Sequence, residues 1–543
     1  MKRKAVAAVL TAVMVASMFT GCGSDKGSSS AKSTSAASAA NDTVDEDGKV
    51  NGIMYQEGLP LVDEGAYTFS IFCDDSSESG EFIMLDEFKK QTNVDVDLKI
   101  YPYETATERL NLDLNSGDYA DVIGGWTLSD NAILTYGVNQ GVFIPLEDYF
   151  EKYCPNISAI LDLPGVREKM TAPDGHIYTI PYVCADTTVG YSPYINTKWL
   201  ENVGMSMPTT TDEFEAVLKA FKEQDANGNG DASDEIPFST DPNNKHIEAM
   251  AGYFGLPMNK LGIAIQNEKV VYGGVSDTYR EFLSWFHKLY AEGLVDVELY
   301  TQDSSTWEGK GNQDLYGVSI AYGSGEFTGI PAAEERGDFD SMPVLNTDKD
   351  GIWLRDTEGF SVYRTQAVIT NKAEHPEIIC RWFDNAFALE NGIGCNRGPV
   401  GVIVNKEDDG YHAIDTTTLS EEDQEKYSWG NLWPQSLPKY LPADFEFVEE
   451  HSMYDEKKAT EEAYEANLTK EIIPSYWIDL DKIDTFSDTN TAIKDFFEQQ
   501  QAQFVCGELD IDNDADWQAY VDGMYSLGLE DWVATQGIAE IAK

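Results

Sequence analysis

Basic side chains are scarce in this 543-residue sequence, in which 38 Lys and Arg stand against 95 Asp and Glu, for a formal net charge of −57. Such a charge repels nucleic-acid phosphates and anionic lipid surfaces, so we expect no nucleic-acid partner and no membrane contact through charge. The negative charge favours solubility and cation binding, and it does not exclude a neutral ligand.

Cysteine is also rare, with seven residues and no C-x-x-C pair. Six of them could form disulfides in 15 different pairings, and sequence cannot choose among these. Free, buried thiols are an equal alternative in a chain of this size. These six residues are Cys73, Cys154, Cys184, Cys380, Cys395 and Cys506.

Catalytic signatures are missing as well. The sequence has no G-x-S-x-G, H-E-x-x-H, P-loop or Rossmann glycine motif, and it has only six histidines for general-base chemistry. We therefore expect no enzymatic activity. A surface glycoside hydrolase with paired carboxylates stays open, because 95 acids always contain a possible pair. A surface adhesin would predict repeats, and no fixed-period repeat is visible.

One long apolar run is present, at the N-terminus. Three basic residues precede an apolar stretch from Ala5 to Phe19, which predicts a secretory signal over residues 1–21. A membrane-spanning helix is the weaker alternative, because crossing a bilayer takes about 20 apolar residues. No other stretch approaches that length.

The end of this run, Phe19-Thr20-Gly21-Cys22, resembles the bacterial lipoprotein signal. The resemblance implies a lipid (palmitate) anchor on Cys22 and a position on the outer face of the cell membrane. Two acyl chains are enough for stable anchoring. Cleavage by an ordinary signal peptidase is the alternative. Residues 22–60 are expected to form a disordered tether, because residues 23–47 have almost no large apolar side chains.

The following body is longer than one hydrophobic core usually serves, so at least two lobes are expected. Apolar periodicity predicts strands and helices in alternation, which indicates a parallel sheet with covering helices. The predicted order is strand 67–73, helix 80–91, strand 94–100, helix 104–115 and strand 121–123. Further along, a strand is expected over 188–194, a helix that starts with a Thr210–Glu213 capping box, and helices over 278–291, 376–389 and 491–504.

The segment from Asp225 to Glu235 has oxygen-bearing side chains at loop positions one, three and five and a glycine at position six. This spacing is typical of a loop that binds Ca²⁺, although position twelve is Ile236 instead of Glu. A solvated turn is the alternative, because Asn and Gly favour turns. The predicted ligands are Asp225, Asn227, Asn229, Asp231 through its carbonyl oxygen, Asp234 and Glu235. We expect this Ca²⁺ to be structural.

Four stretches of the sequence share a pattern with one known family. They are Leu114–Ile123, Pro173–Pro181, Pro208–Phe221 with its following loop, and Trp517–Gly537. Together they resemble the extracellular solute-binding proteins of family 1, and in particular the large lipoprotein members of Gram-positive bacteria. The resemblance implies substrate capture for an ABC-type carbohydrate importer, with the permease subunits as partners. We expect a monomer.

The resemblance also implies an α/β, two-lobed fold of the periplasmic-binding-protein type, with the sugar in a cleft between the lobes. Residues 61–185 would start lobe 1, residues 186–355 would start lobe 2, residues 356–430 would return to lobe 1, and residues 431–543 would complete lobe 2 with C-terminal helices.

Sugar recognition requires aromatic ring faces and polar groups near the carboxyl ends of strands. Trp126 follows the predicted strand 121–123, Tyr322 follows a predicted strand over 316–321, and Asp74 follows the predicted strand 67–73. Trp429 and Trp433 lie in a loop-like segment, and Tyr253 follows the segment Asp225–Glu235, which we call the acidic loop. These six residues are the expected sugar contacts, whereas most of the other aromatic residues are expected in the core.

Overall fold

The computed structural model describes residues 42–75, 81–185, 187–241, 246–329, 337–442, 445, 452–538 and 540–542. The predicted signal over 1–21, the lipidation site Cys22 and the tether up to residue 41 lie outside the described residues. No helix in the described part of the chain is long and apolar enough to cross a membrane.

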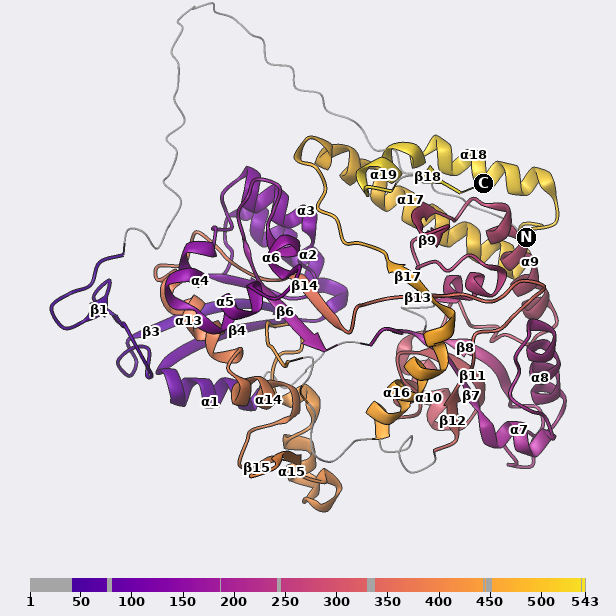
Figure 1. The fold of residues 1–543 in the computed structure, drawn as a ribbon, viewed down its shortest axis with the longest axis horizontal. Coiled ribbons are helices and arrows are strands. Elements are labelled where there is room, and N and C mark those ends of the chain that lie inside the picture. Colours follow the sequence, from indigo (N-terminus) through magenta and orange to yellow (C-terminus); the bar gives the residue numbers. More distant parts are fainter. Residues whose placement is uncertain are drawn as a thin grey trace, which may run out of the picture. The chain divides into compact units, whose positions relative to one another are not determined.

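A five-stranded sheet forms the first lobe (Figure 1). Its order is β4 (Val94–Tyr101), β3 (Tyr67–Asp74), β5 (Val122–Gly124), β14 (Phe360–Ile369) and β6 (Thr179–Ala185). β3 runs parallel to β4 and β5, as the alternation of strands and helices predicts, whereas β14 runs antiparallel to β5 and β6.

Alternating side chains of this sheet enter two different cores, because successive residues of a strand point to opposite faces. Phe69 and Ile71 pack with α1 (Ile83–Thr92), α4 (Glu147–Tyr153) and α13 (Pro376–Ala386). Phe72, Ile123 and Val368 pack on the other face with α2 (Tyr103–Ser116). The first lobe is therefore a sheet covered by helices on both faces.

A four-stranded sheet forms the second lobe, in the order β12 (Phe339–Ser341), β7 (Ser192–Asn196), β11 (Tyr316–Ala321) and β8 (Ile236–Thr240). β11 runs parallel to β8 and antiparallel to β7. Its core includes side chains of α7 (Thr197–Val203), α8 (Thr211–Glu223), α9 (Asp277–Ala291), α17 (Ile483–Cys506) and α18 (Asp514–Ser526).

The predicted strand over 188–194 starts only at Ser192. Its first residues are held by side chains instead of a neighbouring strand. Glu461 of α16 (Ser452–Tyr464) accepts hydrogen bonds from the backbone N–H and the hydroxyl of Thr188, and Asp356 accepts one from the N–H of Gly190 at 2.7 Å. Thr188 and Gly190 thus lie before the strand and are held by the side chains of Glu461 and Asp356.

The helix that starts at Thr210 is confirmed, with one change in its cap. The Thr210 hydroxyl accepts a hydrogen bond from the N–H of Glu213 at 3.2 Å. The Glu213 carboxylate, however, accepts from the backbone N–H of Thr209 at 2.9 Å instead of that of Thr210. The helices expected over 278–291, 376–389 and 491–504 correspond to α9, to α13 with the start of α14 (Leu389–Arg397), and to α17.

Two expected boundaries differ from the structure. Residues 42–60 were expected in the tether, but β1 (Lys49–Val50) and β2 (Met54–Tyr55) form a hairpin whose Val50 and Met54 are buried in the first core. Trp433 and Leu437 also belong to that core, although residues 431–543 were expected in lobe 2. In both cases a few large apolar side chains outside the predicted bounds of lobe 1 pack into its core.

The other elements are short. They are α3 (Asp130–Ala132), η2 (Ile133–Asn139), α5 (Pro155–Leu161), α6 (Val166–Met170), η3 (Ile247–Phe254), β9 (Ile263–Gln266), β10 (Lys269–Tyr272), α10 (Ser304–Asn312), α11 (Gly325–Thr328), β13 (Trp353–Arg355), α14 (Leu389–Arg397), β15 (Val404–Glu407), β16 (Gly410–Ala413), η4 (Thr416–Thr418), α15 (Glu421–Lys426), η5 (Trp429–Asn431), η6 (Glu465–Asn467), β17 (Leu468–Ile472), η7 (Leu480–Lys482), α19 (Leu529–Thr535) and β18 (Glu540–Ile541). The six cysteines of the described residues form no disulfide bond.

Candidate functional site

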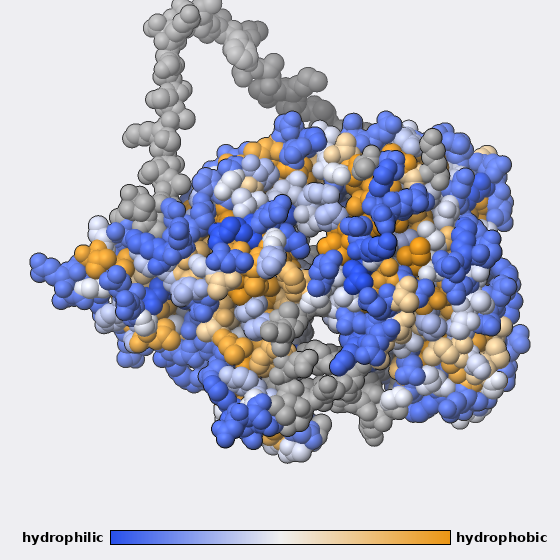
Figure 2. All heavy atoms as spheres, in the orientation of Figure 1, coloured by the Kyte–Doolittle hydropathy of each residue, from blue (hydrophilic) through white to orange (hydrophobic). Residues whose placement is uncertain are grey.

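Large aromatic side chains gather at one exposed place on the first lobe. The ring of Trp126, which follows β5, lies 5.3 Å from Tyr363 of β14 and 6.5 Å from Tyr182 of β6. The two tyrosine rings stack at 5.5 Å. Trp126 is 45% exposed and Tyr363 is 38% exposed. The face drawn in Figure 2 is largely hydrophilic, with smaller hydrophobic patches between the hydrophilic residues.

Trp429 lies near this aromatic group, because Lys439 contacts both Trp429 and Tyr182. The ammonium group of Lys439 lies 5.3 Å from the ring centroid of Tyr182 and 5.6 Å from that of Trp429, which is 57% exposed. We call Trp126, Tyr182, Tyr363 and Trp429 the aromatic platform. An ammonium group at this distance from an aromatic ring is attracted by the negative charge of the ring face.

Lys439 is buried and donates a hydrogen bond to the side-chain oxygen of Gln435 at 2.6 Å. Burial lowers the pKa of Lys439 to about 8. The side-chain N–H₂ of Gln435 in turn donates to the carbonyl oxygens of Trp429 and Trp433, both at 2.9 Å. A buried polar network therefore supports the platform from inside.

Asp74 lies beneath the platform instead of on its surface. Its side chain is fully buried, and its two carboxylate oxygens accept hydrogen bonds from the backbone N–H groups of Trp126 at 2.9 Å and Thr127 at 2.6 Å. Burial raises the pKa of Asp74. Gly125 has a φ of +137°, and a Cβ at this position would lie 2.3 Å from the Asp74 carboxylate. The loop therefore wraps closely around the acid.

Tyr322 lies in a second aromatic group, on the second lobe. Its ring is 6.1 Å from Tyr191, which stacks on His246 at 4.1 Å. The ammonium group of Lys457 lies 4.1 Å from the Tyr322 ring centroid and donates to the carbonyl oxygens of Gly190 and Tyr322 at 2.7 and 2.6 Å. Burial lowers the pKa of Lys457 to about 8. Tyr322 is partly exposed.

Tyr253 and Trp433 are core residues. Both are 0% exposed, Tyr253 in the core of the second lobe and Trp433 against Trp382 and Phe88 in that of the first. Neither ring faces solvent, so we leave both out of the proposed site. Sequence reasoning missed Tyr182, Tyr363 and Tyr191. Tyr182 and Tyr363 are direct partners in the register of β6 and β14, a pairing that local patterns do not reveal.

The acidic loop connects α8 to β8 and is held by its own oxygens. Asp225 accepts from the N–H of Gly230 at 3.0 Å, and Glu235 accepts from the N–H of Ala226 at 2.8 Å. The side-chain oxygens of Asn227 and Asn229 accept from backbone N–H groups two residues further on, at 3.0 and 2.7 Å. The Asp234 carboxylate accepts from the side-chain amides of both asparagines.

Two carboxylate oxygens of this loop fit a bound cation. Oδ1 of Asp225 and Oε2 of Glu235 are buried and have no hydrogen-bond partner, and burial raises the pKa of Glu235. Among the described residues, three acidic or histidine ligand atoms within 4.8 Å of one another occur at Glu407, Asp409 and His412, not in this loop. Asparagine and carbonyl oxygens would therefore have to complete its ligand shell, as they do in Ca²⁺ sites.

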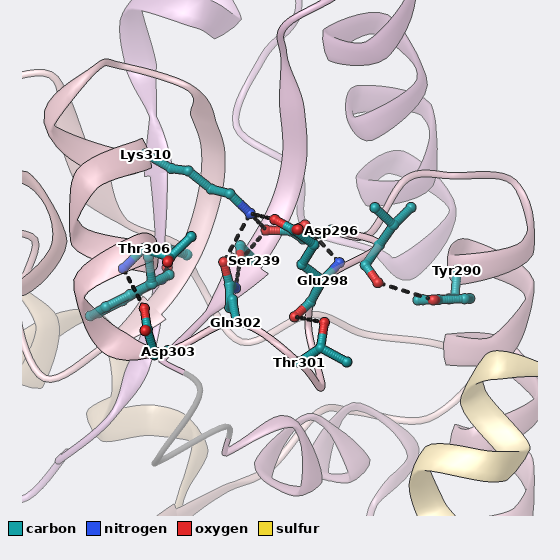
Figure 3. A network of polar contacts seen from close by, with 12 residues as sticks. Ser239, Tyr290, Asp296, Glu298, Thr301, Gln302, Asp303, Thr306 and Lys310 are labelled. Carbon is teal, nitrogen blue, oxygen red and sulfur yellow. Dashed lines mark hydrogen bonds and ion pairs between the residues drawn. The ribbon is translucent and has the colours of Figure 1, made fainter.

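A pair of acids in the second lobe shows why carboxylates alone do not indicate catalysis (Figure 3). Asp296 and Glu298 both form ion pairs with Lys310, at 2.9 and 2.8 Å. Asp296 also accepts from the Ser239 hydroxyl at 3.2 Å, and Ser239 belongs to β8. The network ties α10 to the sheet, which is a structural role.

Comparison with known proteins agrees with this architecture. Residues 76–392 match the family described as bacterial extracellular solute-binding protein. The chain is 32% identical over 379 residues to the fructooligosaccharide ABC transporter substrate-binding protein FusA of Streptococcus pneumoniae, covering 67% of this chain and 68% of FusA. It is 28% identical over 280 residues to the lipoprotein LipO of Bacillus subtilis, covering 50% of this chain and 52% of LipO.

Solved structures extend the similarity to most of the body. FusA in complex with kestose has a TM-score of 0.76 at 26% identity, over 86% of this chain and 98% of that one. The alginate-binding protein AlgQ2 without calcium ion, at 22% identity and a TM-score of 0.71 over 89% of this chain and 99% of that one, shares the fold. The two-lobed α/β fold expected from the sequence is thus confirmed, and the chain belongs to the bacterial extracellular solute-binding proteins.

Proposed function

We propose that the protein captures a carbohydrate, in particular an oligosaccharide, at the cell surface and delivers it to an ABC-type importer. The observation that carries this proposal is the aromatic platform, where four rings from separate segments lie together and three of them, Trp126, Tyr363 and Trp429, are 38–57% exposed. Aromatic rings offer an apolar face to the C–H side of a sugar ring. The name of FusA, the relative at 32% identity, supports an oligosaccharide.

Trp126, Tyr182, Tyr363 and Trp429 are the proposed contacts on the first lobe, and Tyr322 is the proposed contact on the second. Asp74 would act through Trp126 and not by direct contact, because its oxygens are occupied by backbone N–H groups. The alternative, a glycoside hydrolase with paired carboxylates, predicts cleavage products after incubation with an oligosaccharide. Our proposal predicts none.

Ca²⁺ bound by Asp225, Asn227, Asn229, the carbonyl oxygen of Asp231, Asp234 and Glu235 would be a structural component. The support is the pair of buried carboxylate oxygens without a hydrogen-bond donor. A solved FusA structure is described as an EF-hand mutant, so a related protein has a loop of this type. The ion would hold the connection between α8 and β8.

We further propose a lipid anchor at Cys22, which would hold the protein on the outer face of the cell membrane. The protein would act as a monomer, and its partner would be the permease of the ABC importer. The sequence Phe19-Thr20-Gly21-Cys22 and the similarity to the lipoprotein LipO support the anchor. Removal of residues 1–21 would leave Cys22 as the first residue of the mature chain.

The experiment that tests the sugar site compares two matched substitutions by calorimetric titration with oligosaccharides. Trp126→Ala removes a 45% exposed ring of the platform, whereas Tyr525→Ala removes a 42% exposed ring on α18. We expect Trp126→Ala to weaken binding by about tenfold or more, which corresponds to about 1.4 kcal/mol. Tyr525→Ala should bind like the wild type. Equal affinities for all three proteins would reject the platform as the site.

A further inference from the structure

The two exposed tryptophans of the platform are held by two consecutive acids at the end of β3. Asp74 accepts hydrogen bonds from the backbone N–H groups of Trp126 and Thr127. Asp75 accepts one from the backbone N–H of Gln435 at 2.8 Å, and the Gln435 side chain donates to the carbonyl oxygen of Trp429 at 2.9 Å. One strand end is therefore linked to both tryptophan segments.

These links are buried and charge-assisted. Asp74 is 0% exposed, Asp75 is 2% exposed and Gln435 is 7% exposed. Hydrogen bonds that an ionised carboxylate accepts are stronger than neutral ones, and burial keeps water from replacing them. Further contacts join the same strand end to the Trp429 segment, since the Ser436 hydroxyl donates to the carbonyl oxygen of Asp74 and its oxygen lies 3.2 Å from the Cys73 sulfur.

Asp74 is packed tightly against the loop formed by residues 125–127. Both carboxylate oxygens are used, and the loop approaches so closely that only a glycine fits at position 125. An asparagine at position 74 would turn an N–H₂ group toward one of the two backbone N–H donors, because an amide has one accepting oxygen. The carboxylate is thus needed to keep the loop in this shape.

We propose that Asp74 and Asp75 are positioning residues that set the placement of Trp126 and Trp429 relative to each other and so determine which oligosaccharides the site accepts. The inference rests on the proposed function for its sugar readout. The placement itself can be measured without any sugar. A rigid strand end is a suitable support, because binding surfaces need their anchor side chains locked by a second layer of contacts.

The test combines ¹⁹F NMR of protein labelled with 5-fluorotryptophan and calorimetric titration with kestose, maltotriose, cellotriose and trigalacturonate. The chain has 11 tryptophans, and the Trp126→Phe and Trp429→Phe variants identify the two signals of interest. Asp74→Asn and Asp75→Ala are compared with the matched controls Asp97→Asn and Asp97→Ala on β4, where the Asp97 side chain is 62% exposed.

In the absence of sugar, we expect Asp74→Asn to shift the Trp126 signal and leave the Trp429 signal in place. We expect the reverse for Asp75→Ala, which removes the acceptor of the Gln435 N–H. Both variants should lower the affinity for the best-bound sugar at least tenfold and change the order of preference within the panel. Asp97→Asn and Asp97→Ala should change neither the spectrum nor the affinity. If Asp74→Asn does not fold, Gly125→Ala disturbs the same contact from the loop side and should move the same signal.

Unchanged tryptophan signals in both variants would overturn the positioning roles, including the case in which affinity falls, because the acids would then contact the sugar directly. Shifted signals with wild-type affinity and preference would overturn the role in selection. Failure of the proposed function looks different, because no sugar of the panel would then bind the wild-type protein while the sugar-free spectra would still report on placement.

Discussion

Two lysines, Lys439 and Lys457, are buried in a protein that has few basic residues. Lys439 and Lys457 each lie against exposed or partly exposed aromatic rings, and burial lowers the pKa of each to about 8. Sequence alone could not select them from the other lysines, because nothing nearby in the chain marks them as buried. The exposure of Trp126 was predictable from its place after a strand, whereas the burial of Trp433 depends on Trp382, a partner 51 residues away that no local pattern reveals.

The lowered pKa of Lys439 predicts a specific dependence of stability on pH. The unfolded lysine keeps its proton up to about pH 10.4, whereas the folded one loses it near pH 8, so unfolding takes up a proton between these values. The free energy of unfolding should therefore rise from pH 8 to pH 10.4, by about 3 kcal/mol for this residue. Lys439→Met should remove that rise. Denaturant unfolding at pH 7.5 and 10 measures it, with Lys99→Met as the exposed control. The same pH dependence in wild type and Lys439→Met would contradict the prediction.

At the scale of elements, the strands and helices with their own periodicity were predictable. β3, β4, β5, α1 and α2 each show a local apolar pattern, and the structure confirms their order. The family resemblance led us to expect β6 and β14 in lobe 1, but local patterns did not predict which strands they would pair with. β14 pairs with both β5 and β6 across long sequence separations, and it runs antiparallel to both.

The loop between α8 and β8 carries a prediction of its own. Addition of Ca²⁺ should raise the melting temperature, because a ligand at 100 times its Kd stabilises a folded protein by about 2.7 kcal/mol. Asp225→Asn should lose this stabilisation, since it removes one of the buried carboxylate oxygens without a partner. Asp231→Asn should keep it, because Asp231 is expected to bind through its carbonyl oxygen. Scanning calorimetry with Ca²⁺ and with a chelator measures all three proteins. If the wild-type protein melts at the same temperature with Ca²⁺ and with the chelator, the proposed Ca²⁺ site is wrong.

At the scale of the whole molecule, two sheets with separate cores account for the length of the chain. Residues from 67 to 185 and from 360 to 369 supply the first sheet, and residues from 192 to 341 supply the second. The length of the chain predicts at least two lobes, and the family resemblance predicts which segments belong to each lobe. The predicted bounds of lobe 1 differ from the structure in two places, because residues 42–60 and 432–437 also contribute to the first core. Such additions depend on tertiary contacts and leave little trace in the sequence.

The central claim is that the protein binds an oligosaccharide and returns it intact. It is tested most directly by calorimetric titration of the wild-type protein with a panel of neutral and acidic oligosaccharides, followed by chromatography of the recovered sugar. We predict saturable binding of at least one member of the panel at micromolar Kd or tighter, with the sugar recovered unchanged. Absence of binding across the panel, or release of shorter sugars with new reducing ends, would contradict the account.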